Sequence, residues 1–511
     1  MVGAVIGIDL GTTNSAVGHL DANGRPQVLR NREGQLVTPS VVHFSGGLAL
    51  VGAMAKRSAA EAALDTVQFV KRHMGEGDWA FTAPDGQVYR PEEVSALLLR
   101  RLVEDAEAAL GEPVDAAVIT VPAYFDDARR RATQHAGEIA GLRVLRVLNE
   151  PTAAALAYCV DHQLDGRLLV YDLGGGTFDV TVVDVEQGRR FTVRGTEGDR
   201  NLGGFDWDNA LMRWVDARFQ EAGGPPLLGD VDREAALRDR VEVCKHTLTT
   251  MPEATVLLSA NGHTERVQVT RAQFDEVTAQ LLYRTEVLVE GLLEDLDIDW
   301  DDIDHVLLVG GSTRMPQVRE RLAMWTSPDK ILRSPRVDEL VALGAAVQAG
   351  LETLNEPGRL APFARASLQR VTVVDVTSHG LGVLVQDPTT GSRANSVIIP
   401  RNSTIPAEAT ERYATTSEGQ TVLHVQVTQG DEEDAEYARV IGTQKVDFPP
   451  RPANWPVDIS FVYTVDQMVA ISVRDGRSGE LVGRFAVENQ ANMDIEVVQQ
   501  ATARLKGIPS V

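Results

Sequence analysis

One stretch of the chain, Leu168 to Val185 (LLVYDLGGGTFDVTVVDV), carries residue types that suit phosphate and cation binding. Asp172 ends an apolar run, and three glycines, Thr177 and Asp179 lead into a second apolar run, which favours two strands joined by a glycine-rich turn. Such a turn can gather backbone N–H groups around an anion, while the flanking carboxylates can hold a divalent cation through its waters. On its own, the pattern is more often a simple tight turn.

The same pattern recurs near the N-terminus, where AVIGIDLGTTNSAVGHLD places Asp9 between an apolar run and a loop that contains Gly11 and Thr12. This repetition predicts two lobes of similar design, each offering a phosphate loop to a cleft between them. A third glycine loop, LLVGGSTRMP at Leu307 to Pro316, also follows a buried strand. None of the three loops matches the P-loop or the dinucleotide-binding pattern.

Other elements must position these loops. The patterns predict a strand over Val114 to Val121, a helix followed by a loop over Gly52 to Met74, and helices over 91–111, Asp126 to Ile139, Asp230 to Met251 and onward from Thr270. Arg129, Arg130 and Arg131 are consecutive, so they point in different directions around their helix, and most of this run is expected to be solvated surface.

The helix over Asp230 to Met251 is a candidate for binding a nucleoside. Glu242, Lys245, His246 and Thr249 follow one another at helical spacing and share one face. The pattern alone is equally typical of an exposed polar face.

Composition excludes several classes of function. The formal net charge of -24 argues against a nucleic-acid partner, because phosphate neutralisation needs clustered Lys and Arg. Cys159 and Cys244 are far apart, with neither metal-ligand spacing nor a disulfide framework, so a reducing cytoplasm is the expected setting. No signal-peptide pattern and no run of about 18 apolar residues occurs, so neither export by that route nor a membrane partner is expected.

The C-terminal third has a different pattern of apolar and polar residues. Short alternating runs such as TVLHVQVTQG and VDISFVYTV predict an antiparallel β-sandwich. A connector rich in Pro, Gly and Arg precedes them, and the acidic loop from Asp295 to His305 is expected to be a solvated loop, although its alternating aspartates also admit calcium. We therefore expect an α/β domain over 1–352, a connector and linker over 353–375, an all-β domain over 376–490 and a short helical tail over 491–511.

Five motifs identify a family resemblance. IGIDLGTTNS, ITVPAYF, NEPTAAALAY, YDLGGGTFD and GGSTRMP resemble motifs of the 70-kDa heat-shock (DnaK-type) chaperones, in the same order, from residue 2 to about residue 488. The resemblance implies a two-lobed, actin-like ATPase domain followed by a β-sandwich that binds peptides. It also implies ATP or ADP with Mg²⁺ as cofactors, and K⁺ as a further candidate ion.

The resemblance assigns roles to individual residues. Hydrolysis is implied for Lys71, Glu150, Asp172 and Thr177, and cation binding through water for Asp9, Asp172 and Asp179. Contacts to ATP or ADP are implied for Gly11, Thr12, Thr13, Asn14, Gly174, Gly175, Gly176, Gly203, Gly204, Glu242, Lys245, His246, Thr249, Gly310, Gly311, Ser312, Arg314 and Asp338. Coupling between domains is implied for Pro122, Arg130 and Asp375, and contact with a J-domain co-chaperone for Arg146.

The chain departs from the family at several positions. GDRNLGGFDWD resembles GDTHLGGEDFD but carries Arg200, Asn201, Phe205 and Trp207 at variant positions, so phosphate contact is less certain there. His246 replaces an arginine that packs on the base, so base stacking is expected to be weaker and pH-sensitive. RVTVVDV resembles the apolar interdomain linker, although an ordinary first strand is the alternative.

The peptide site implied by the resemblance also contains departures. In the family, loops at one end of the sandwich bind an extended peptide through backbone hydrogen bonds and one apolar pocket. The matching positions are Val383, Gln386, Tyr413, Thr416, Leu423 and Val425. Gln386 and Thr416 stand where apolar residues usually arch over the peptide, and Leu423 should reshape the pocket. The tail is too short for the family's helical lid, so a lid-less protein is expected.

The function expected from all these features is ATP-dependent, chaperone-like binding of extended apolar polypeptide segments, with slow Mg-dependent ATP hydrolysis. J-domain and nucleotide-exchange partners are expected to accompany it. Two alternatives remain open from the sequence. A nucleotide-gated adaptor would bind one dedicated partner through the β-domain, and a sugar-kinase-like phosphotransferase would share the ATP loops but would need a sugar pocket.

Overall fold

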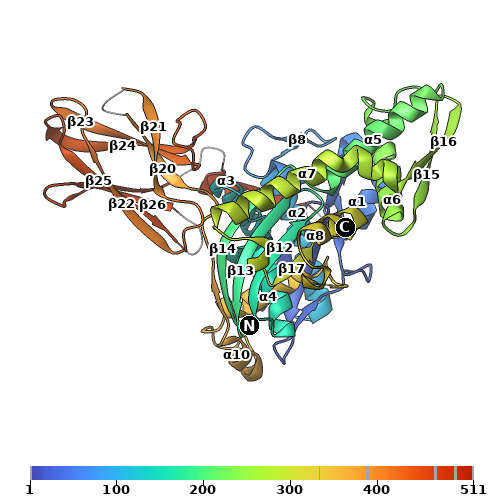
Figure 1. Cartoon of the computed structure of the whole chain (residues 1–511), viewed down its shortest axis with the longest axis horizontal. Coiled ribbons are helices and arrows are strands. Elements are labelled where there is room, and N and C mark those ends of the chain that lie inside the picture. Colours follow the sequence, from blue (N-terminus) through green and yellow to red (C-terminus); the bar gives the residue numbers. More distant parts are fainter. Residues whose placement is uncertain (1–2, 333, 387–390, 465–468, 488–491, 509–511) are drawn as a thin grey trace.

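The computed structural model describes residues 3–332, 334–386, 391–464, 469–487 and 492–508. A two-lobed α/β body carries a β-sandwich that projects from one side (Figure 1). The expected boundary between the sandwich and the tail, at residues 490 and 491, lies outside the described residues.

The first lobe is built on a mixed sheet. Its order is β11 (Arg143–Asn149), β10 (Val114–Val121), β1 (Ala4–Asp9), β2 (Asn14–Leu20) and β3 (Pro26–Val28). Strand β1 runs parallel to β10 and antiparallel to β2, so the loop between β1 and β2 lies at the carboxyl end of β1. Apart from Asp115, β10 is buried, as expected for the centre of an α/β sheet.

The second lobe repeats this arrangement. Its sheet has the order β18 (Ile331–Leu332), β17 (His305–Val309), β12 (Gly166–Leu173), β13 (Phe178–Glu186), β14 (Arg190–Asp199) and β19 (Thr372–Val374). Strand β12 is antiparallel to β13 and parallel to β17, as β1 is to β2 and β10. The predicted similarity of the two lobes is therefore present in the strand pairing.

Two helices cross between the sheets. Helix α4 (Glu150–His162) and helix α9 (Leu340–Glu352) pack closely, because a Cβ on Gly344 would lie 1.7 Å from the carbonyl oxygen of Ala153. Helix α9 also approaches β1, where a Cβ on Gly7 would lie 2.1 Å from the backbone nitrogen of Ala346. These contacts leave no room for a side chain, so the base of the two lobes is tightly joined.

The outer parts of the lobes carry the remaining helices of the body. They include α2 (Pro91–Leu110), α3 (Asp127–Ile139), α5 (Gly204–Glu221), α6 (Val231–Thr250), α7 (Arg271–Asp295) and α8 (Pro316–Trp325), with the hairpin β15 (Glu253–Ala260) and β16 (His263–Thr270) beside α6. Asp126, Asp230 and Thr270 cap the helices that follow them, which confirms the starts predicted from the sequence.

The region from Gly52 to Met74 is more varied than predicted. Helix α1 is short (Ala53–Ser58), and strand β7 (Thr66–Gln68) follows it before a 3₁₀ turn over Val70–His73. Strand β7 pairs with β5 (Val41–Ser45), which in turn pairs with β6 (Leu48–Val51). The pairing partners lie more than twenty residues away, so the local pattern did not indicate them.

The expectation for the arginine run was wrong. Arg129 and Arg130 are buried, on a helix α3 that packs against α2 and helix α11 (Ile495–Leu505). The Arg129 guanidinium lies 2.6 Å from the Asp126 carboxylate, and the Arg130 guanidinium donates to the carbonyl oxygens of Ala123 and Phe125. Burial is tolerated because these charged groups have partners.

The sandwich contains two antiparallel four-stranded sheets. One has the order β21 (Arg393–Ile399), β20 (Leu381–Gln386), β23 (Gln420–Gln429) and β24 (Arg439–Arg451); the other has β22 (Ala407–Ala414), β25 (Pro456–Tyr463), β26 (Val469–Asp475) and β27 (Leu481–Ala486). Alternate residues of the strands face a shared core, as in β25, where Val457, Ile459, Phe461 and Tyr463 are buried.

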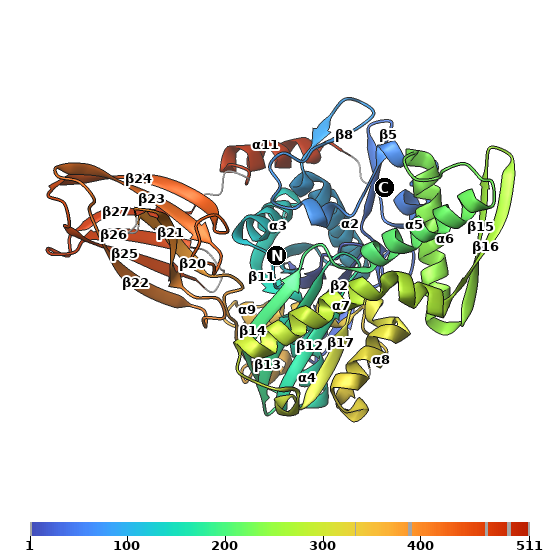
Figure 2. The same cartoon turned by 45° about the horizontal axis from the view of Figure 1, so that its top comes forward.

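Three segments attach the C-terminal part to the body. The connector contains helix α10 (Pro362–Leu368), and β19 then pairs with β14 at the edge of the second sheet. Helix α11 lies on the first lobe beside α3, away from the sandwich (Figure 2). The core of the first lobe includes three residues of α11, Val498, Ala501 and Leu505, and also Met493, which lies just before the helix.

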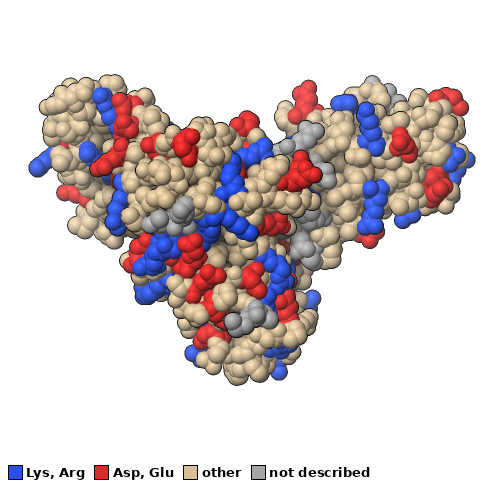
Figure 3. Space-filling model, turned by 180° about the vertical axis from the view of Figure 1, so that it is seen from behind, with Lys and Arg blue, Asp and Glu red and all other residues tan. Residues whose placement is uncertain are grey.

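On the face in Figure 3, acidic and basic side chains are interspersed, with no extended basic area. Within the described part of the chain, no helix is long and apolar enough to cross a membrane.

Candidate functional site

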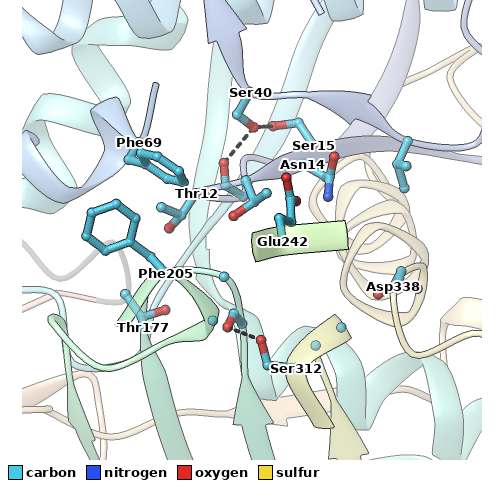
Figure 4. Close-up of a pocket in the computed structure, with 18 of the residues that line it drawn as sticks. Thr12, Asn14, Ser15, Ser40, Phe69, Thr177, Phe205, Glu242, Ser312 and Asp338 are labelled. Atoms are coloured by element: carbon cyan, nitrogen blue, oxygen red, sulfur yellow. Dashed lines mark hydrogen bonds between the residues drawn. The ribbon is translucent and has the colours of Figure 1, made fainter. Parts of the chain in front are cut away.

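A cavity of about 450 Å³ lies between the lobes, where the three predicted glycine loops converge (Figure 4). A volume of this size suits a small-molecule ligand. The predicted site residues that line it are Asp9, Gly11, Thr12, Thr13, Asn14, Lys71, Glu150, Asp172, Gly174, Gly175, Thr177, Gly204, Glu242, Lys245, His246, Thr249, Gly310, Gly311, Ser312, Arg314 and Asp338.

Gly176, Gly203 and Asp179 do not line the cavity. A Cβ on Gly176 would lie 2.4 Å from Thr12 Cγ2, and one on Gly203 would lie 2.5 Å from the Gly176 backbone nitrogen. These glycines therefore serve close packing between the loops. Asp179 lies behind the cavity wall and accepts a hydrogen bond from the Tyr124 backbone N–H at 3.0 Å.

One end of the cavity holds a dense group of charges. Lys71 is buried and its Nζ donates to the Glu150 carboxylate. Burial raises the pKa of Asp9 and of Asp179 to about 7, and the negative charge of Glu150 adds to both shifts. The pKa of Asp172 is raised well above its ordinary value for the same two reasons.

This carboxylate group fits a hydrated divalent cation. The Oδ2 atoms of Asp172 and Asp179 are buried and have no hydrogen-bond partner among the described residues. Hard oxygen donors are those that Mg²⁺ prefers, and it usually keeps several of its waters. In the part of the chain that the structure describes, no three His, Cys, Asp or Glu residues are arranged to hold a metal directly.

At the other end of the cavity, charged side chains are paired with one another. Lys245 Nζ lies 2.8 Å from the Asp208 carboxylate and donates to the carbonyl oxygen of Gly204 at 3.0 Å. Glu242 pairs with Lys56 at 2.7 Å, so one ion pair spans the cleft between the lobes. On the opposite wall, Arg314 lies 2.6 Å from the Asp338 carboxylate. A nucleoside would have to accommodate or replace these pairs.

His246 provides a pH test of the nucleoside end. The surrounding protein lowers the pKa of His246 below its ordinary value of 6.5, and the positive charge of Lys245 adds to the shift. His246 is an exposed residue of the cavity lining. Because burial lowers its pKa, the histidine is mostly neutral at pH 7 and gains a proton as the pH falls.

We expect nucleotide affinity to fall by up to about tenfold between pH 7 and pH 5, because a bound base would bury the imidazole and favour its neutral form. Titration of a fluorescent ADP analogue across this range measures the effect. His246→Arg should flatten the profile, and a wild-type profile that is already flat would place His246 away from the base.

The structure adds site residues that the sequence argument missed. Lys56, Phe69, Asp208, Arg238 and Phe205 all line the cavity. The sequence singled out Phe205 only as a variant position of its motif. An apolar side chain at a position expected to lie in a charged cleft was the available signal. Lys56 and Arg238 gave no signal, because single basic residues on helices are usually solvated.

The predicted coupling residues lie between the domains. The Asn149 side-chain amide donates to the Asp375 carboxylate at 3.1 Å and accepts from Arg130, so these residues form a buried chain of contacts. Pro122 follows β10, and Ala123 after it accepts a hydrogen bond from Ser378 Oγ at 2.5 Å. Arg146 pairs with Glu352 at 3.2 Å on the outside of the first lobe.

The predicted peptide-binding residues are not gathered in one open pocket. Val383 and Val425 are buried in the sandwich core, and Leu423 packs against that core. Gln386 and Thr416 are exposed, and the Gln386 amide donates to the Gly391 carbonyl oxygen at 3.2 Å. Tyr413 lies 2.9 Å from Ser396, a hydroxyl contact that joins the two sheets.

Duplicated sheets around a cleft, glycine loops and buried carboxylates define a two-lobed, actin-like ATPase domain, here followed by a β-sandwich. Comparison with known proteins identifies the group: the family model "Hsp70 protein" matches residues 5–502. The chain is 38% identical to "Chaperone protein DnaK" from each of two strains of Thermus thermophilus, over 98% of this chain and 83% of the relative.

The chain therefore belongs to the Hsp70 family, which confirms the resemblance and the fold class. Members of this family are chaperones that bind and hydrolyse ATP, and those functions are assigned here at that general level. A match that extends through the sandwich gives no support to the sugar-kinase alternative.

Proposed function

We propose that Mg-ATP bound between the lobes controls the affinity of the β-sandwich for extended apolar polypeptide segments. The observation that carries this proposal is the pairing of β19 with the start of β14, over Arg190 to Thr192. The other end of β14, Asp199, leads directly to Gly203 and Gly204 beside the cavity. One strand therefore connects the segment that precedes the sandwich to a loop of the nucleotide site.

Further contacts support communication between the domains. Arg439 of β24 pairs with Asp126, which caps helix α3 of the first lobe. Arg401 pairs with Glu197 of β14 at 2.7 Å. The Asn402 side chain accepts a hydrogen bond from the Thr196 backbone N–H at 3.1 Å. The sandwich thus contacts both lobes, so a change in the angle between the lobes would change its docking.

Hydrolysis would depend on position and charge. The glycine turns, Thr12, Thr13 and Thr177 would hold the phosphates, and Asp9, Asp172 and Asp179 would hold the cation through its waters. When bound, Mg²⁺ neutralises phosphate charge. Lys71 and Glu150, whose side chains are in contact, would orient the attacking water. No covalent intermediate is needed, and slow turnover that partners can raise is expected.

The polypeptide would bind at the end of the sandwich that carries Gln386 and Thr416, both of which are exposed. Because Val383 and Val425 are buried by the protein's own residues, a pocket for an apolar side chain would require local rearrangement. A J-domain co-chaperone would contact the surface around Arg146, and a nucleotide-exchange factor is a further candidate partner. These partners are inferred from the family.

The test is binding to a panel of unrelated fluorescent peptides in nucleotide-free, ADP and ATP states. We expect several apolar peptides to bind, with faster release in ATP than in ADP. Binding to a single sequence would favour the dedicated adaptor, and equal release in all states would contradict nucleotide control. Each measurement should be paired with a charged peptide of the same length, which is not expected to bind.

A further inference from the structure

Two phenylalanines meet across the mouth of the cleft. Phe69 belongs to the first lobe, and Phe205 belongs to the first turn of α5 in the second lobe. Their ring centroids are 4.6 Å apart and the rings are tilted by 59°. Both residues line the cavity near Thr12 and Thr177, which places the pair over the end where the glycine loops converge (Figure 4).

Two arginines stack on the same ring. The guanidinium carbons of Arg72 and Arg238 each lie 4.5 Å from the centroid of Phe205. Arg72 comes from the first lobe and Arg238 from α6 of the second, so the stack joins the lobes. A contact of this kind favours association by about two- to thirtyfold, depending on how far it is desolvated.

Both arginines are held in place by other contacts. Arg72 donates to the Gly176 carbonyl oxygen at 2.8 Å and pairs with Asp206. Arg238 donates to the side-chain oxygen of Asn209 at 2.8 Å and pairs with Glu234 at 3.6 Å. These contacts orient both arginines toward Phe205.

The backbone of Phe69 is also unusual. It has a φ of 59°, in the left-handed region that a phenylalanine rarely adopts. Conformations of this kind persist where surrounding contacts compensate for their cost, and they are common at functional sites. Phe69 directly precedes the 3₁₀ turn that carries Lys71 and Arg72. Phe69, which makes the contact between the lobes, and the hydrolytic Lys71 therefore belong to the same short segment.

We propose that Phe205, together with Phe69, Arg72 and Arg238, forms a clasp that holds the lobes closed over the phosphates and limits the rate of nucleotide release. Separation of the lobes at this end would break the aromatic pair and the Arg72 stack together. The similar family motif GDTHLGGEDFD has glutamate at the position where this chain places the aromatic ring of Phe205.

The test is stopped-flow release of N-methylanthraniloyl-ADP from the full chain. Phe205→Ala is expected to release the nucleotide at least about tenfold faster than wild type, since it loses the stack on Arg72 and the contact with Phe69. Phe205→Glu should restore slow release by pairing with the arginines. Its release should accelerate with salt more steeply than that of wild type, because ion pairs are screened.

Phe363→Ala serves as the matched control, because Phe363 is 68% exposed and does not line the cavity. Arg238→Gln provides a second variant in case Phe205→Ala does not fold, and it should also accelerate release. Wild-type release from a folded Phe205→Ala or Arg238→Gln protein would overturn the proposal. So would a Phe205→Glu protein that releases nucleotide as fast as Phe205→Ala.

Discussion

Replacement of Lys71 by alanine is expected to lower the single-turnover rate of ATP hydrolysis by about 10²- to 10³-fold, with a much smaller change in nucleotide affinity. Lys71 is buried, and its Nζ is in contact with Glu150 at the end of the cavity that holds Asp9 and Asp172. Its charge would act on the reacting phosphate and water. Affinity would come mainly from the backbone of the glycine loops.

The measurement is hydrolysis of one equivalent of ATP by excess protein, followed in parallel with equilibrium binding. Lys56→Ala is an informative comparison, because Lys56 also lines the cavity but pairs with Glu242 at the opposite end. It should weaken binding more than hydrolysis. Wild-type single-turnover hydrolysis by Lys71→Ala would show that the lysine has no part in the reaction.

The charge balance around Lys71 also predicts that arginine would be a poor substitute. The positive charge of Lys71 lowers the pKa of Asp9, Asp172 and Asp179, which burial and Glu150 raise. A planar guanidinium would keep the charge but require more space and different donor directions. We therefore interpret the lysine as a compact charge in a closely packed wall.

Most of the ATPase fold could be predicted from the sequence, because its signals are local. Strand β10 has the predicted bounds of Val114 to Val121, and the polar residues predicted to start α3, α6 and α7 are their caps. The convergence of the three glycine loops on one cleft was predicted because the same pattern of strand and glycine turn recurs along the chain. Each signal depends on residues that are neighbours in the chain.

Features formed by distant residues could not be predicted in this way. Arg129 pairs with Asp126, which also pairs with Arg439, a residue that lies more than 300 positions later in the chain. The stack on Phe205 depends on Arg72 and Arg238. These residues are far from one another in the chain, and no repeating pattern in the sequence connects them. The peptide-binding residues stay a prediction, because alternation along a strand indicates which side chains face inward but not whether a pocket opens among them.

Replacement of Asp375 by alanine is expected to remove most of the acceleration of peptide release by ATP, leaving less than about a twofold difference between ATP and ADP. The Asp375 carboxylate is buried and accepts from the Asn149 side chain at 3.1 Å and from the Val376 backbone N–H at 2.9 Å. Hydrogen bonds to a charged group contribute roughly 1.5–3 kcal/mol each, enough to change a docking equilibrium by about tenfold or more.

Release of a fluorescent peptide in ATP and in ADP measures this effect, with nucleotide affinity followed on the same samples. Affinity should stay close to wild type, because Asp375 does not line the cavity. Asp458→Ala is the matched control: its carboxylate pairs with Arg412 at 2.7 Å on the sandwich surface, away from the linker, so coupling should persist. Full ATP acceleration in Asp375→Ala would contradict the role of this contact.

Nucleotide control can be no stronger than the difference in docking free energy between the ATP and ADP states. Asp375 contributes to that difference only if its contacts are made in one state and lost in the other.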